Sequence, residues 1–120
     1  MTLEMSERRV DEVVVLELSG RLTLGPDCDS FDKRVQELMR GGNRAILLQC
    51  EKLSGIDSQG IKCLVRAAER VREQGGRLKF CAISRRVREV LQITHVWEVL
   101  EIFPGEAEAL TSFQSARDTT

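Results

Sequence analysis

The sequence contains no tyrosine and a single histidine, and these shortages limit the chemistry it can carry. Acid–base and nucleophilic catalysis need convergent donor groups, of which histidine is the most common. His95 lies in the run Ile93–Trp97, and no carboxylate stands at a spacing typical of a catalytic pair with histidine. This favours a structural histidine over a catalytic one. The phosphate-loop, nucleophile-elbow and HExxH motifs are absent as well. We therefore expect neither an enzyme nor a cofactor.

An excess of one charge is also missing, and so is any long apolar run. The 18 basic and 19 acidic residues are interspersed and give a formal net charge of −1, unlike the basic footprint of a nucleic-acid binder. No apolar run approaches the ~20 residues of a membrane span, and the first residues lack the pattern of a signal peptide. We expect no nucleic-acid partner, no membrane insertion and a cytoplasmic location.

The four cysteines form no C-x-x-C pair; they are Cys28, Cys50, Cys63 and Cys81. A zinc site would have to be assembled entirely by the fold. Free thiols that act as small buried hydrophobes in a reducing compartment are the simpler interpretation.

What the sequence does contain is a regular alternation of strand and helix patterns in a length suited to one domain. We expect a single domain over residues 1–120, with a core over about 3–113 and a polar tail over 114–120. Apolar spacing predicts strands over 3–10, 13–18, 44–50, 77–83 and 99–103. Helices are expected to begin near Pro26, Ser58 and Ser84, and a last helix carries Ala107, Leu110 and Phe113. This order predicts an α/β fold with a single mixed β-sheet of about five strands and helices mainly on one face.

The stretch Leu53–Gly60 joins a buried apolar run to the most amphipathic helix of the sequence. A helix start at a strand end presents unpaired N–H groups and partial positive charge, which suits ligands and partners. A purely structural interpretation is also open, because Ser54 and Asp57 resemble a capping box and Asp57 could itself cap the helix. Capping does not explain the second hydroxyl, Ser58, or Gly60, which lets another backbone approach.

Phosphorylation of Ser58 would have a clear physical effect. A phosphate adds roughly −1.5 to −2 charges, and a helix N-terminus tolerates negative charge, so the fold should survive. An interface packed against Ser58 would instead face a bulky unpaired charge, which is costly when buried. A serine here can switch binding without switching structure.

Several motifs occur together in this sequence: Gly20-Arg21-Leu22, Ala45–Leu48, Leu53–Ile61, the Gly75-Gly76 turn and Cys81–Ser84. In this combination they closely resemble the anti-sigma-factor antagonists of the STAS (sulfate transporter and anti-sigma-factor antagonist) domain family. The resemblance covers residues 3–113 and implies a STAS-like fold. It also implies a bacterial regulator that works by partner switching: the unmodified form captures an anti-sigma factor serine kinase and frees a sigma factor. The kinase phosphorylates the antagonist with its own ATP, and a serine phosphatase restores it.

Carried onto this chain, the resemblance makes Ser58 the phosphoacceptor, while Asp57 shapes its environment and contacts the partner. The partner-binding residues are expected to be Asp57, Ser58, Gln59, Gly60, Lys62 and Thr23. Two positions depart from the family pattern. Gln59 stands where many members have a second serine, and Thr23 stands where many have aspartate.

Two alternatives remain open from the sequence. Stand-alone relatives also serve in lipid-transport and stress-signalling assemblies, where the same helix edge docks a partner without phosphorylation. An enzyme built on Ser58 or Cys63 is a further possibility, but no base is visible for either nucleophile.

Overall fold

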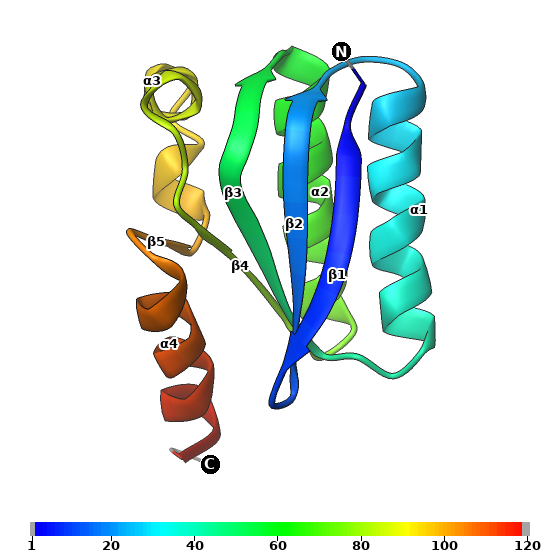
Figure 1. The fold of residues 1–120 in the computed structure, drawn as a ribbon, viewed down its shortest axis with the longest axis vertical. Coiled ribbons are helices and arrows are strands. Elements are labelled where there is room, and N and C mark those ends of the chain that lie inside the picture. Colours follow the sequence, from blue (N-terminus) through cyan, green and yellow to red (C-terminus); the bar gives the residue numbers. More distant parts are fainter. Residues whose placement is uncertain (1, 119–120) are drawn as a thin grey trace.

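The computed structural model describes the backbone of residues 2–118 and the side chains of residues 2–114. Its centre is one five-stranded sheet in the order β1-β2-β3-β4-β5 (Figure 1). The strands are β1 (Glu4–Val10), β2 (Val13–Leu22), β3 (Ala45–Ile56), β4 (Arg77–Cys81) and β5 (Ile102–Phe103). The helices are α1 (Pro26–Arg40), α2 (Ser58–Glu73), α3 (Arg85–Ile93) and α4 (Glu106–Asp118), with a 3-10 turn at Trp97–Val99.

The strand order explains where the helices lie. β1 and β2 form the predicted antiparallel hairpin, and every later neighbour in the sheet is parallel. Because the parallel strands add in one direction and their crossovers are right-handed, α1, α2 and α3 must cover the same face. α4 follows the last strand and packs on the opposite face of the sheet; it lies at the lower left of Figure 1, below β5. The predicted fold class, a mixed sheet with helices mainly on one face, is confirmed.

Alternation along the strands divides the core in two. Leu16, Leu48 and Phe80 point toward α1, α2 and α3, where they meet Phe31 and Leu64 in the larger cluster. The smaller cluster lies under α4 and consists of Val13, Val15, Leu47, Cys81, Ala109 and Phe113. All four cysteines are free and buried, as predicted. No helix within residues 2–118 combines the length and apolar content that a membrane crossing requires.

Several predicted boundaries were wrong. β3 continues six residues beyond Cys50 because the end of β2 pairs with it as far as Leu22 and Ile56. β5 holds two residues instead of the predicted five, since Val99 lies in the 3-10 turn and is 68% exposed. α4 extends through much of the predicted tail, to Asp118, while residues 119–120 lie outside the described residues. Within α4, Ala109 is buried and Ala107 is exposed.

Candidate functional site

Asp57 is the single residue between the end of β3 and the start of α2, and it is the N-cap of α2. Its Oδ1 accepts a hydrogen bond from the Gly60 N–H at 2.8 Å, as an N-cap carboxylate typically does. Its Oδ2 accepts from the Leu24 N–H at 2.9 Å. These N–H groups, Leu24 first, hold the pKa of the Asp57 carboxyl below its usual value. The predicted cap at Asp57 is confirmed, and the same side chain also ties the β2–α1 loop to α2.

The predicted capping box that began at Ser54 was wrong. Ser54 still lies in β3, where its Oγ donates to the Gly20 carbonyl of β2 at 3.0 Å. The chain is extended here and cannot form the tight turn that a capping box needs. Ser54 therefore joins two strands and leaves the helix start to Asp57.

Gly60 is buried in the first turn of α2, against the end of β2. A Cβ at this position would lie 2.2 Å from the Leu22 carbonyl oxygen and 2.6 Å from Ile56 Cγ1. The close approach expected at this glycine is thus made by the chain's own backbone. A part for Gly60 in binding a partner stays a prediction, and it would act through the shape of this turn.

Ser58 is the first residue of α2, and its side chain is exposed. Lys62 is exposed one turn later on the same helical face, because residues four apart are neighbours on a helix surface. Gln59 is half-buried and lines a small pocket of about 220 Å³ beside Leu24. Thr23 is half-buried in the loop that Asp57 holds. The fold therefore brings all six predicted site residues to one edge, where the strands end.

Two neighbours of this edge are not among the six predicted site residues. Leu24 is 71% exposed in the β2–α1 loop, although it is apolar. The sequence signal for this exposure was an apolar residue placed in a predicted loop, between Thr23 and the turn-forming Gly25. Arg21 lies over Gly55: its Cζ is 3.2 Å from the place where a Gly55 Cβ would stand. Gly55 thus leaves room for a guanidinium beside the site.

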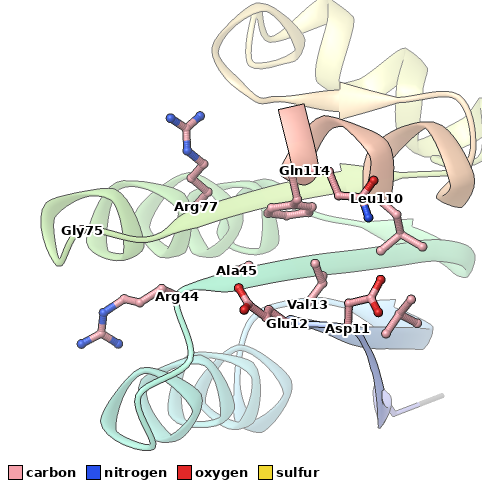
Figure 2. Close-up of a pocket in the computed structure, with 11 residues that line it drawn as sticks. Asp11, Glu12, Val13, Arg44, Ala45, Gly75, Arg77, Leu110 and Gln114 are labelled. Carbon is pink, nitrogen blue, oxygen red and sulfur yellow. The ribbon is translucent and has the colours of Figure 1, made fainter. Parts of the chain in front are cut away.

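A larger pocket lies at the other end of the sheet, beside the β1–β2 turn (Figure 2). It measures about 700 Å³, and its lining includes Val13, Leu110 and Phe113. Arg44 and Arg77 stand at one side and are directed away from the cavity in Figure 2. The Arg44 guanidinium donates to the Met39 and Asn43 carbonyls at 3.0 Å each. None of the six predicted site residues lines this pocket.

Comparison with known proteins gives the family. The family model of the STAS domain matches residues 4–109. An anti-sigma F factor antagonist from Paenibacillus polymyxa is 24% identical over 115 residues, which cover 95% of this chain and 96% of that protein. This match extends across both ends of the sheet.

Two solved proteins share the fold. TM1081 from Thermotoga maritima superposes with a TM-score of 0.82 at 24% identity, covering 90% of this chain and 92% of its own. The Bacillus anti-sigma factor antagonist SpoIIAA gives TM-scores of 0.67 for its unphosphorylated form and 0.68 for its phosphorylated form, at 19% and 21% identity. Those superpositions cover 97% and 92% of this chain and 98% and 99% of SpoIIAA. This chain belongs to the STAS domain family and is similar, over nearly its whole length, to that family's anti-sigma factor antagonists.

Proposed function

We propose that this chain is a single-domain anti-sigma factor antagonist controlled by phosphorylation of Ser58. In its unmodified form it binds an anti-sigma factor serine kinase and so releases a sigma factor. Phosphorylation by that kinase ends the binding, and a serine phosphatase reverses it. The cytoplasm is the compartment in which such a switch would work.

The observation that carries this proposal is the difference in contacts between Asp57, which caps the helix, and its neighbour Ser58, which is exposed. Asp57 turns inward, and each of its carboxylate oxygens accepts a backbone N–H. The Ser58 hydroxyl is exposed at the first helical position, and it makes no hydrogen bond with the residues whose side chains the structure describes. The structural work of the junction therefore falls on Asp57, and Ser58 is left accessible to another protein's active site.

A phosphate on Ser58 would be compatible with the fold. It would sit at the N-terminus of α2, where the helix dipole favours negative charge. Lys62, four residues later, supplies a nearby cation. The same group would add bulk and charge to a surface formed by Gln59 and the exposed Leu24. Phosphorylation is thus expected to disrupt a docked partner and to leave the folded domain intact.

The same geometry argues against catalysis by Ser58. Asp57 is the adjacent carboxylate, but its oxygens are occupied by the Leu24 and Gly60 N–H groups and its pKa is lowered. A carboxylate with a lowered pKa is a poor general base at neutral pH. We propose that the site does no chemistry of its own and serves as the substrate of the kinase.

The direct test is to incubate the purified chain with its anti-sigma kinase and ATP and to measure intact mass. We expect one added phosphate on the wild type and none on Ser58→Ala. Ser54→Ala is the matched control, because Ser54 lies in the same signature but its hydroxyl is bound to Gly20; it should still be phosphorylated. Equal phosphorylation of Ser58→Ala would refute the assignment.

A binding measurement completes the test. Ser58→Asp should keep the far-UV spectrum and the melting temperature of the wild type and lose affinity for the kinase. Unfolding of Ser58→Asp would show that the junction is only structural. Recovery of a transport complex from cells, with no kinase, would favour the constitutive subunit described above.

A further inference from the structure

Two cysteines meet directly beneath the proposed partner surface. Cys28 lies in the first turn of α1 and Cys63 in the second turn of α2. Both line the small pocket that also borders Leu24 and Gln59, and each is 8% exposed. Cys28 and Cys63 thus line one pocket from two packed helices, and burial, together with the neighbouring Cys63 thiol, raises the pKa of the Cys28 thiol to about 12. A small oxidant can therefore reach a pair of adjacent free thiols.

The helix packing provides the spacing that a disulfide needs. α1 and α2 pack side by side on one face of the sheet, and the Arg70–Asp32 ion pair at 2.7 Å joins them further along. Helices in contact have axes about 8–10 Å apart, which leaves the Cα atoms of directly facing residues about 3.5–5.5 Å apart. The upper half of that range overlaps the Cα separation of about 4.4–6.8 Å that disulfides span.

We propose that Cys28 and Cys63 form a reversible disulfide when the chain meets hydrogen peroxide. The Cys63 thiolate attacks the peroxide, the O–O bond breaks, and a sulfenic acid and one water are formed. The second thiol then displaces the hydroxyl from the sulfenic sulfur, which forms the S–S bond and releases a second water. The two thiols lose two electrons and two protons in total, and the peroxide is reduced.

The bond would alter the edge that carries Ser58. Asp57 accepts a hydrogen bond from Leu24, and Gly60 packs against Leu22, so the first turn of α2 is already held against the end of β2 and the following loop. Cys63 lies one turn further along α2, and Cys28 lies in the first turn of α1. Bonding draws the two sulfurs from contact to ~2 Å, so the first turns of α1 and α2 must move together. Gln59 and Leu24 lie over this pair. We expect oxidation to lower the rate at which the kinase phosphorylates Ser58, a consequence that rests on the proposed function.

The chain contains its own control pair. Cys50 and Cys81 lie on the neighbouring strands β3 and β4, and both are fully buried. Cys50 belongs to the larger core cluster and Cys81 to the smaller one under α4, so their side chains point to opposite faces of the sheet. A disulfide between them would have to pass through the sheet. These two thiols should stay reduced.

The first experiment measures the disulfide itself. The reduced full chain is treated with hydrogen peroxide, unfolded, and labelled with a maleimide. Oxidation should lower the labelled thiols from four to two, remove two hydrogens from the intact mass, and yield a linked Cys28–Cys63 peptide that dithiothreitol separates. Cys28→Ser should abolish the link, whereas Cys50→Ser should keep it. Four labelled thiols after oxidation, or a link that persists in Cys28→Ser, would overturn the proposal.

The second experiment measures the consequence. Oxidised and reduced wild type are compared as kinase substrates, with the Cys28→Ser/Cys63→Ser double variant treated in the same way. The oxidised wild type should be phosphorylated at least several-fold more slowly, and peroxide should not affect the double variant. If the linked peptide forms but the phosphorylation rate does not change, the disulfide exists and its proposed effect on the Ser58 surface is wrong. Absence of phosphorylation in every sample would count against the proposed function alone.

Discussion

The two ends of the parallel strands differ in shape and in the use of their polar groups. At the carboxyl end, Asp57 ties the β2–α1 loop to α2 and leaves Ser58 exposed on a surface with only a small pocket. At the amino end, the β1–β2 turn and α4 border a pocket of about 700 Å³, over an apolar floor of Val13 and Phe113. The end with the larger cavity carries none of the predicted site residues.

The difference is consistent with the proposed function. A small-molecule site needs a concave, largely enclosed cavity, whereas a residue that another enzyme modifies must protrude. At the carboxyl end the backbone of the junction is fixed by hydrogen bonds, so the surface is both ordered and exposed. The amino end is shaped by the packing of α4. Four changes, one of them with a matched control, test this separation and are ordered by their expected effect on stability.

Phe113→Ala should destabilise the chain most, at the end far from Ser58. Phe113 is buried in the smaller core cluster, and its ring centre lies 4.6 Å from the Nζ of the buried Lys79. Removing a buried phenylalanine typically costs about 3–5 kcal/mol. Urea unfolding should show this loss, while phosphorylation of the folded fraction keeps the wild-type rate. Loss of phosphorylation in the folded protein would mean that the two ends are coupled.

Gly60→Ala should have the next largest effect, at the Ser58 end. The new Cβ would meet the Leu22 carbonyl oxygen at 2.2 Å, so β2 and α2 must separate. Overpacking of this kind costs about 1–3 kcal/mol, and we expect slower phosphorylation as well because the first turn of α2 moves. Unfolding and kinase assays on the same sample measure both effects.

Gly75→Ala is the matched control for this change. Gly75 has a φ of +84°, but a Cβ there would meet nothing within 4 Å. Only the backbone conformation is strained, at a cost of about 1 kcal/mol, and phosphorylation should not change. An equal loss of phosphorylation in both variants would contradict a specific role for the turn at Gly60.

Asp57→Ala should cost about 1 kcal/mol at neutral pH, because it removes an N-cap. The cost should depend on pH, since the pKa of the Asp57 carboxyl is lowered in the folded chain. A lowered folded pKa gives stability that is present above the unfolded value of about 3.9 and is lost as pH falls through the folded pKa. The difference between wild type and Asp57→Ala in urea unfolding should therefore shrink between pH 5 and pH 3. A constant difference would show that the charge of Asp57 contributes nothing.

Local signals predicted helix boundaries at both ends of the sheet correctly. The Gly75-Gly76 pair marked the end of α2, and Asp57 before a periodic apolar run marked its start. Non-local pairing could not be predicted in the same way. The end of β3 depends on the end of β2, where the register shifts twice between Glu17 and Arg21. That pairing places Ser54 against Gly20, so a residue that resembled a cap became a link between strands.

The bond between Asp57 and Leu24 was hidden for the same reason. The two residues are 33 positions apart, and no periodic pattern relates a loop N–H to a helix cap. The contact between Cys28 and Cys63 also arises only when α1 and α2 pack together on the sheet. Sequence reasoning thus located the strand-to-helix junction along the chain, and tertiary contacts determine which of its residues hold the fold and which are exposed.

Ser58→Ala should change stability least, by less than about 0.5 kcal/mol, because an exposed hydroxyl with no partner among the described residues contributes little. Its effect on function should be complete, since no other hydroxyl in Asp57–Gly60 can accept the phosphate. Urea unfolding and intact-mass phosphorylation assays, run beside Asp57→Ala, separate the two roles. If Ser58→Ala instead lost as much stability as Asp57→Ala, its hydroxyl would be part of the cap. Asp57 and Ser58 would then both be structural residues of the helix start, and the main argument for phosphorylation control at this end of the sheet would be lost.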